Sequence, residues 1–296
     1  MVASLYRQIV PASFRQYIYD AFLGDFLFHL RHIRVHIKGK LTFLFSWLLP
    51  KTEENKALAF IGKYGITSYP APYSLEYKGK KVDVLFDNSR KLHFIIHNGR
   101  KLFFPKVFTL EKISTLYLEL TTEQDIRSAH RYVVAYDELK GKTLLDIGSA
   151  EGIFSLDTIE FVEHVYLFEC ETFWIEALKA TFEPWSQKTT IVEKYVGDKT
   201  AGIFITIDDF LKDKPKNNIF LKMDIEGAEQ SALRGASQTL KNGKNMNVAV
   251  CTYHKPEDPK EISAFLSSLG YSFEFTSGML FWGKRLSKAL IRAKKQ

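Results

Sequence analysis

The sequence predicts an α/β fold built on a mostly parallel sheet. Three apolar runs carry this prediction, because buried parallel strands are continuous apolar segments rather than alternating ones. The runs end in the acidic residues Asp146, Glu169 and Asp224, and the third continues into a segment whose apolar residues recur at helical spacing. Since open α/β sheets bind ligands at the carboxyl ends of their strands, we expect the three acids on one rim.

The first run, 143–147, opens into a turn that contains Gly148 and Gly152. Glycines there let backbone amides approach a ligand with no Cβ in the way. The G-x-x-x-G spacing differs from that of dinucleotide sites and phosphate loops, neither of which the sequence contains. Asp146 at the strand tip suits a ligand that carries an ammonium group. The alternative is an ordinary strand-to-helix turn capped by Ser149.

The second run, 165–168, ends in Glu169, which lies 17 residues after Gly152. Adjacent parallel strands end at the same edge, so Glu169 is expected beside the glycine turn. Its carboxylate can accept hydrogen bonds from both hydroxyls of a ribose. The alternative is that Glu169 and Glu171 are first-turn acids of the next helix, where the helix dipole favours them.

The third run, 218–224, leads into Ile-Glu-Gly-Ala-Glu and a helix that Gly243 ends. With this segment, four motifs resemble the FkbM family of S-adenosylmethionine-dependent methyltransferases. They are DIGSAEG at 146–152, LFECE at 167–171, ITIDDFL at 205–211 and LKMDIEGAEQSALRGA at 221–236. The resemblance covers about residues 125–282, and the last motif is its most specific part.

The resemblance implies a Rossmann-like, seven-stranded, mostly parallel sheet flanked by helices, with S-adenosylmethionine as cofactor. A closing antiparallel hairpin is expected from 271–276 and 279–282. The residues after strand-like 190–192 are expected to present the third strand's end to the adenine. The expected cofactor contacts are Asp146, Gly148, Ser149, Gly152, Glu169, Val196, Gly197 and Asp198.

Methyl transfer to oxygen requires that the protein align the acceptor and remove its hydroxyl proton. His254 ends the next strand-like segment and is the only histidine on the predicted rim, so we expect it to be the base, with His130 in reserve. The alternative for His254 is a bond to nearby backbone. Asp224 and Glu226 are expected to orient His254, bind the acceptor or hold a cation. We predict no metal, because a few carboxylates are weak evidence for one.

The segment just before the first strand is expected to be a helix that begins at Glu123 and ends near Gly141. It must cross close to the cofactor's open edge. His130 and Arg131 are therefore candidate substrate-binding residues, together with Tyr132. The alternative is a surface helix.

We divide the chain into a helical segment, 1–60, a small antiparallel β-meander, 61–122, the methyltransferase domain, 123–282, and a basic tail, 283–296. Apolar residues at helical spacing in the first segment are Phe22, Leu23, Phe26, Leu27 and Leu30. Short alternating runs around Lys78-Gly79 and Asn98-Gly99 indicate the meander, and Asn-Gly is a strong hairpin signal.

The net charge is +7, and six of the excess cations lie in 283–296, which contains no acid. The tail fits a basic amphipathic helix that is either solvated or lies on an anionic membrane. The basic and apolar segment 31–49 is expected to pack on the catalytic domain or a second copy, or to touch a membrane. Because most excess charge is in the tail and no basic strand is interleaved with aromatics, we expect no nucleic-acid partner.

The 296 residues are 46% hydrophobic and include two cysteines, which offer no disulfide framework or metal cluster. With no signal sequence and no apolar run near the roughly 20 residues that span a bilayer, we expect a cytoplasmic, at most membrane-peripheral, enzyme. The expected reaction is O-methylation of a sugar or other hydroxylated intermediate in glycan or secondary-metabolite synthesis. One alternative is a non-catalytic, membrane-associated or complex-forming module that retains the methyltransferase fold. Another is a nicotinamide-dependent oxidoreductase, which the missing G-x-G-x-x-G disfavours.

Overall fold

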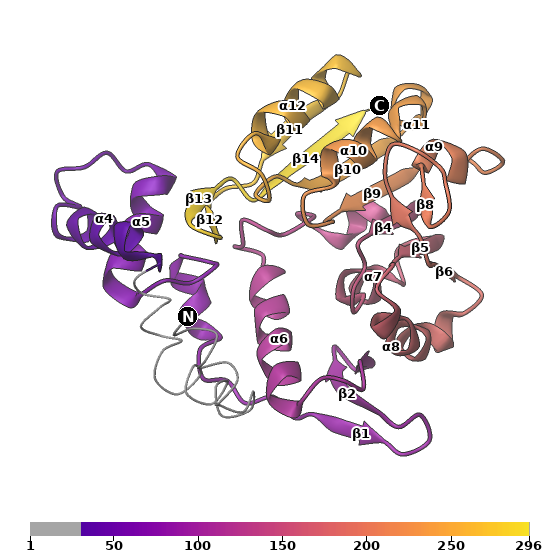
Figure 1. Ribbon diagram of the computed structural model, residues 1–296, viewed down its shortest axis with the longest axis horizontal. Helices are drawn as coiled ribbons and strands as arrows, with labels where there is room; N and C mark the ends of the chain where they lie inside the picture. Colours follow the sequence, from indigo (N-terminus) through magenta and orange to yellow (C-terminus); the bar gives the residue numbers. More distant parts are fainter. Residues whose placement is uncertain (1–30, 296) are drawn as a thin grey trace, which may run out of the picture. The chain divides into compact units, whose positions relative to one another are not determined.

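The computed structural model describes residues 31–295, so the helical spacing between Phe22 and Leu30 lies outside the described residues. The chain forms two compact units (Figure 1). One unit is built from the chain up to Ala71 together with Phe281–Leu286. The other is built from Pro72–Leu280 together with the residues from Ser287 onward.

The larger unit contains a seven-stranded sheet, as predicted. Its strands, in chain order, are β4 (Thr143–Ile147), β5 (His164–Phe168), β6 (Thr189–Val192), β9 (Ile219–Met223), β10 (Met246–Cys251), β11 (Ser272–Phe275) and β14 (Leu290–Lys295). Their order in the sheet is β11-β14-β10-β9-β4-β5-β6. β14 runs antiparallel to both of its neighbours, and the other pairs are parallel.

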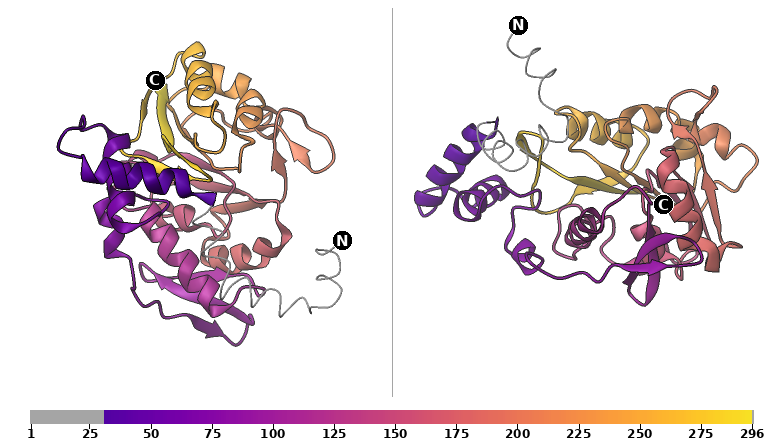
Figure 2. Two further views of the ribbon diagram at one scale, coloured as in Figure 1. Left: turned by 60° about the vertical axis from the view of Figure 1, so that its left-hand side comes forward. Right: turned by 60° about the horizontal axis from the view of Figure 1, so that its bottom comes forward.

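Helices cover both faces of this sheet (Figure 2). They are α7 (Ile153–Thr158), α8 (Thr172–Phe182), α9 (Ile207–Phe210), α10 (Glu229–Arg234), α11 (Ser237–Asn242) and α12 (Asp258–Ser268). Alternate residues of β9 face opposite sides: Leu221 packs with the core beneath α9 to α12, whereas the Phe220 ring lies 6.0 Å from that of Phe154 on α7. All five residues of β9 are buried, which accounts for its unbroken apolar run.

The closing strands differ from the expectation. β11 forms as predicted, but β12 (Leu280–Trp282) pairs with β13 (Arg285–Ser287) in a separate two-stranded sheet. The seventh strand is β14, within 283–296, so the amphipathic helix expected there is wrong. The apolar spacing of Leu290, Ile291 and Ala293 suits either structure, and pairing with β10 and β11 decides for the strand.

The cations of β14 have partners within the fold. Arg292 pairs with Glu274 at 3.5 Å, and Lys294 pairs with Glu138 at 3.4 Å. The Lys295 ammonium donates to the carbonyl of Leu240 at 3.2 Å, near the end of α11, where the helix dipole favours a cation. The cations of β14 therefore form ion pairs and hydrogen bonds with groups of the same unit.

The helix expected from Glu123 is also wrong. α6 (Leu110–Glu123) ends where that helix was expected to begin, and only a short 3-10 turn, η3 (Tyr136–Leu139), follows before β4. The Asp125 carboxylate accepts hydrogen bonds from the backbone N–H and the guanidinium of Arg127, each at 2.8 Å. Such a local side-chain bond competes with helix continuation and leaves an irregular segment that can approach the sheet edge.

The antiparallel meander is confirmed. Its strands are β1 (Leu85–Asp87), β2 (Leu92–His97) and β3 (Arg100–Phe104). Asn98 and Gly99 have φ values of 49° and 79°, as a two-residue hairpin turn requires. No strand flanks Lys78-Gly79 within the described residues, where the 3-10 helix η2 (Pro72–Glu76) is followed by turns.

The smaller unit contains the helix pair α4 (Ile33–Leu44) and α5 (Glu53–Tyr64). The helices cross closely at two glycines: a Cβ on Gly62 would lie 2.1 Å from the carbonyl oxygen of Gly39. The His32 imidazole contacts the carbonyl of Gly283 at 2.8 Å, which joins the two chain segments of the unit. Among the described helices, none is long and apolar enough to cross a membrane.

Candidate functional site

A pocket of about 360 Å³ opens at the carboxyl ends of β4, β5 and β9. The chain leaves β4 toward β5 and β6 on one side and later builds β9 and β10 on the other, so β4 and β9 form the switch point of the sheet. The pocket is lined by Ile147, Gly148, Ala150, Phe168, Glu169, Cys170, Glu171, Trp174, Lys194, Tyr195, Val196, Asp224, Ile225, Glu226 and Ala228.

Gly148 holds the ends of β4 and β9 together. Its φ is +78°, and a Cβ there would lie 1.9 Å from the carbonyl oxygen of Asp224. Gly152, with φ +79°, is the N-cap of α7 and packs against the Phe182 ring, 2.7 Å from where a Cβ would be. Only glycine tolerates both the left-handed backbone and these distances. Gly148 lines the pocket, whereas Gly152 and Ser149 support the turn from outside the lining.

Glu169 is fixed by the backbone of two strand ends. Its Oε1 accepts hydrogen bonds from the amides of Cys170 at 2.8 Å and Glu171 at 2.7 Å, and its Oε2 accepts one from Ala150 at 2.8 Å. Because a carboxylate oxygen can accept two bonds, Oε2 retains one acceptor position. The side chain lines the pocket and is otherwise buried, so this position is available to a ligand hydroxyl.

Asp146 does not line the pocket, contrary to the expected cofactor contact. The carboxylate is 1% exposed, lies 2.9 Å from the Lys222 ammonium and accepts a hydrogen bond from Ser155 at 2.6 Å. Lys222 also donates to the carbonyl of Gly148 at 2.6 Å. Burial acts to lower the pKa of Lys222, but Asp146 and Asp224 outweigh it and raise that pKa. The ammonium that Asp146 binds is thus the protein's own, and the pair stabilises the glycine turn.

The strand end after β6 reaches the pocket only in part. Val196 lines the pocket with Tyr195 and Trp174, which gives this side flat and apolar walls. The residues Gly197 and Asp198, also expected as cofactor contacts, lie outside the lining. Gly197 packs against Gly235, where a Cβ would lie 1.9 Å from the Gly197 carbonyl oxygen, and Asp198 pairs with Arg234 at 3.3 Å. Both residues therefore contact the segment around α10.

Asp224 lies between two histidines. Its Oδ2 is 3.6 Å from Nε2 of His130, and its Oδ1 is 3.7 Å from Nε2 of His254. Tyr132 donates a hydrogen bond to Oδ2 at 2.9 Å. Burial acts to raise the pKa of Asp224, but His130, Lys222 and His254 outweigh it and lower that pKa. The site therefore holds Asp224 as an anion at the wall of the pocket.

A glutamate lies behind each histidine, and Glu123 is half-buried whereas Glu229 is fully buried. Nδ1 of His130 is 3.3 Å from Glu123, and Nδ1 of His254 is 2.8 Å from Glu229. Burial acts to lower the pKa of both imidazoles, but Glu123 and Glu229 respectively raise it above the ordinary value. In each imidazole Nδ1 lies on the side of the glutamate and Nε2 on the side of Asp224.

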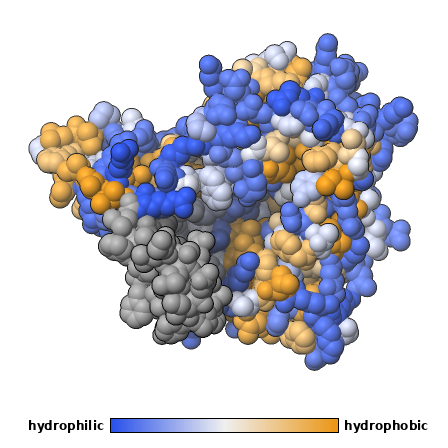
Figure 3. Space-filling model, in the orientation of Figure 1, coloured by the Kyte–Doolittle hydropathy of each residue, from blue (hydrophilic) through white to orange (hydrophobic). Residues whose placement is uncertain are grey.

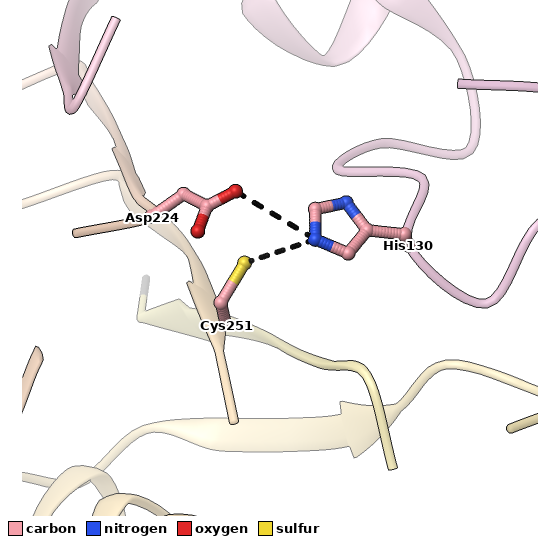
Figure 4. Close-up of side chains that lie close together, drawn as sticks. All are labelled: His130, Asp224 and Cys251. Carbon is pink, nitrogen blue, oxygen red and sulfur yellow. Dashed lines mark hydrogen bonds and ion pairs between the residues drawn. The ribbon is translucent and has the colours of Figure 1, made fainter. Parts of the chain in front are cut away.

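Neither histidine is part of the pocket lining itself. The His254 side chain is 3% exposed, and its Nε2 lies 3.6 Å from Oε2 of Glu226, which does line the pocket and has a φ of 54°. His130 meets Asp224 and Cys251 (Figure 4), with 3.4 Å from its Nε2 to the Cys251 sulfur. Asp224 and Glu226 thus stand between the pocket and His254.

The same groups bring candidate metal ligands together. Donor atoms of His130, Asp224 and Cys251 lie within 4.8 Å of one another, as do those of Asp224, Glu229 and His254. Burial raises the pKa of the Cys251 thiol well above its ordinary value, and metal binding requires the thiolate. Hydrogen bonding and ion pairing account for these contacts, and the absence of a metal site stays a prediction.

Arg131 is not brought to the site. Its guanidinium lies over the Tyr136 ring at 5.0 Å and donates to the carbonyl of Gln124. A helical pattern could not predict that His130 faces the site and Arg131 does not, because this segment is irregular. Glu229 and Glu123 were missed as site residues. The sequence carries no signal for them, because the fold, and not the spacing along the chain, brings each carboxylate near its histidine.

The family model of the methyltransferase FkbM domain matches residues 124–273. Among curated proteins there is no match. The methyltransferase FkbM from Methylobacillus flagellatus is 20% identical, with a TM-score of 0.42, and the alignment covers 63% of this chain and 55% of that one. The chain thus spans little more than half of that protein.

Two further solved structures are similar at lower identity. A precorrin-6y C5,15-methyltransferase from Geobacter metallireducens is 12% identical over 55% of this chain and 86% of its own, with a TM-score of 0.39. A putative methyltransferase from Streptococcus mutans in complex with SAH is 11% identical over 54% and 95%, with a TM-score of 0.40. The family model covers just over half of the 296 residues. The chain belongs to the FkbM methyltransferase family.

Proposed function

We propose that the protein is an S-adenosylmethionine-dependent methyltransferase that methylates a hydroxyl oxygen. The observation that carries the proposal is one pocket lined by Glu169, with a free acceptor position, and by Asp224, behind which His254 lies. Glu169 suits the binding of a ribose, and Asp224 together with His254 suits the removal of a hydroxyl proton. Family membership supports the class of reaction.

The chain's residues fit the proposed cofactor. Gly148 lets the turn pack directly against the Asp224 carbonyl at the pocket wall, and Oε2 of Glu169 is positioned to accept from a ribose hydroxyl. Trp174, Tyr195 and Val196 offer flat apolar surface for an adenine. When bound, the sulfonium supplies an activated methyl group, so the protein's tasks are alignment and proton removal.

His254 is the proposed base. Glu229 holds the proton on Nδ1, which leaves the lone pair of Nε2 facing Asp224 and Glu226. A hydroxyl bound between these carboxylates would transfer its proton to Nε2, which would leave its oxygen ready to accept the methyl group that the bound cofactor would supply. The anion of Asp224 then stabilises the imidazolium.

The acceptor we propose is a sugar or another hydroxylated intermediate. Hydroxyls donate to carboxylates, and the pocket wall offers Glu171 and Glu226 in addition to Asp224. The Glu226 side chain is 77% exposed, so it can meet a ligand group that remains at the pocket mouth. These carboxylates can accept hydrogen bonds from hydroxyls on more than one kind of ring, so the shape of the acceptor decides which oxygen is methylated.

Calorimetric titration with S-adenosylmethionine and S-adenosylhomocysteine tests the cofactor. Binding is expected, together with thermal stabilisation equivalent to about 2.7 kcal/mol when the ligand is at 100 times its dissociation constant. Glu169→Ala should weaken binding about tenfold or more, because it removes a charged acceptor of a ribose hydroxyl. The control is Glu163→Ala, an exposed carboxylate outside the pocket. Equal affinity for all three proteins would contradict the assignment of Glu169, and absence of binding to the folded wild type would refute the function.

A further inference from the structure

The outward face of α4 is apolar. Ile33, Ile37, Leu41 and Leu44 recur every three or four residues and are 48%, 53%, 51% and 63% exposed. The opposite face, which packs on α5, is made of small or polar side chains instead. Its buried residues are Gly39 and Thr42. The helix is therefore amphipathic with its apolar side directed away from its own partner helix.

The apolar face continues beyond the end of the helix. Phe45, Trp47 and Leu48 in the following turns are 50%, 74% and 61% exposed. Figure 3 shows hydrophobic side chains gathered over the α4–α5 pair with hydrophilic ones beside them. A contiguous apolar patch rimmed by polar groups marks an interaction site rather than scattered surface residues.

The charges within the segment that forms this patch all have one sign. The segment 31–51 contains five cations and no aspartate or glutamate: Arg31, Arg34, Lys38, Lys40 and Lys51. At 100° per residue, Arg34 lies on one side of the apolar stripe and Lys40 on the other, and both are exposed. Lys38 pairs with Glu54 of α5 at 2.8 Å, whereas Arg34 and Lys40 form no ion pair within residues 31–295.

We propose that this face docks on the surface of an anionic lipid bilayer. Cations on both sides of an apolar stripe let the helix lie parallel to the surface, with its apolar side chains among the acyl chains and its lysines and arginines extended to lipid phosphates. An exposed tryptophan suits the headgroup boundary. The patch offers no acidic residue that would repel such a surface. In the other candidate segment, 283–296, residues 290–295 are built into the sheet as β14 and do not form an amphipathic helix.

Flotation of the full chain with lipid vesicles tests the proposal. Vesicles of phosphatidylcholine with phosphatidylserine should carry the protein, whereas phosphatidylcholine alone should not, and added salt should weaken binding because the attraction is electrostatic. The proposal is overturned if the protein floats with neither kind of vesicle. It is also overturned if the protein floats equally with both, since the cations would then have no role.

Paired variants locate the contact. Leu44→Glu with Trp47→Glu should lower vesicle binding at least about tenfold, and Arg34→Gln with Lys40→Gln should do the same by removing two charges that face the anionic lipid. The matched control is Val107→Glu with Ile126→Glu, two residues that are also apolar and each 73% exposed. Circular dichroism checks folding, and the charge variant keeps the test valid if the first pair unfolds.

Light scattering separates the other occupants of this face. If the wild type ignores vesicles but forms a dimer that the Leu44→Glu and Trp47→Glu pair dissociates, the face binds a second copy and the proposal is wrong. If the control pair loses vesicle binding as strongly as the α4 variants, the contact is elsewhere on the chain and the proposal is again wrong. Cofactor binding is measured on each variant and is expected to stay unchanged.

Discussion

Glu229 has no exposed surface, and three contacts hold its carboxyl group in place. Its Oε1 accepts from the backbone amides of Ile225 at 3.0 Å and Gly227 at 3.4 Å and contacts Nδ1 of His254 at 2.8 Å. One carboxylate thereby fixes both the loop after β9 and the tautomer of the proposed base. Glu229 acts through His254 and is a positioning residue.

Glu229→Gln should move the rising limb of the pH–kcat profile to lower pH. The base must be neutral to accept a proton, so turnover rises as the pH passes the pKa of His254, which Glu229 and the other carboxylates raise above its ordinary value. Glutamine keeps an oxygen for the backbone amides but removes the negative charge, which lowers that pKa. Steady-state rates across the pH range measure the shift.

His254→Ala provides the matching control for that profile. It should lower kcat by about 10²- to 10⁴-fold, the usual contribution of a general base, with the cofactor dissociation constant little changed. A limb that stays at the same pH in the Glu229→Gln protein would assign the titration to another group, such as His130. Cofactor affinity, measured separately, shows whether the pocket itself is intact.

At the scale of the elements, the ends of β4 and β9 form the most constrained junction of the site. The Asp224 amide donates to the carbonyl of Ile147 at 3.1 Å, and Gly148 packs directly against the Asp224 carbonyl. The glycine turn and the Asp224 segment therefore form one junction, although 75 residues lie between Gly148 and Asp224 in the sequence.

Gly148→Ala should disrupt this junction. The added Cβ has no room beside the Asp224 carbonyl, and a left-handed backbone costs a residue with Cβ about 1–2 kcal/mol in addition. We expect about tenfold or weaker cofactor binding and a lower unfolding midpoint in urea. Gly202→Ala is the control, because Gly202 also has positive φ, +57°, but open space around its Cβ position. Similar losses in both variants would show that backbone strain, not the junction, is responsible.

Buried parallel strands and their acidic ends were the elements most readily predicted. β4, β5 and β9 follow the apolar runs, and the Asn98-Gly99 hairpin follows turn chemistry. The segment from Gln124 to Ala135 could not be predicted, because its path depends on local side-chain bonds such as that between Asp125 and Arg127. Asp146 illustrates the same limit at the site: a strand-end acid reads as a ligand group until its partner Lys222, far along the chain, is known.

For the whole molecule, the topology was predictable up to β11 and then failed. A run of Leu, Ile and Ala among cations suits a helix or a strand, and only tertiary pairing with β10 decides between them. Family resemblance implied the number of strands but not which segment supplies the seventh. Each of the two compact units is likewise built from two separate stretches of the chain, and no change in composition marks where these stretches begin or end.

Truncation after Gly283 should abolish the cooperative unfolding transition. It removes β14, which is hydrogen-bonded to both β10 and β11 and buries Leu290 and Ile291 completely. Each such side chain contributes about 1.5–3 kcal/mol, and a domain's total stability is only about 5–15 kcal/mol. Calorimetry and circular dichroism measure the loss.

The control for truncation removes tail charge without removing the strand. Arg285→Gln with Lys288→Gln should leave the transition in place, because neither residue belongs to β14. A truncated protein that still melts cooperatively would show that β14 is dispensable to the sheet.

β14 also fixes the order in which a growing chain can complete its sheet. β11 is made before β14 but lies beyond it in the sheet, and β14 is its only strand partner among the described residues. While the ribosome still covers 290–295, residues 272–275 have no strand to pair with, and β10 presents an open edge. During synthesis the chain must therefore carry both unpaired edges until β14 emerges, and unpaired edges of this kind are prone to aggregation, against which a chaperone would protect the chain.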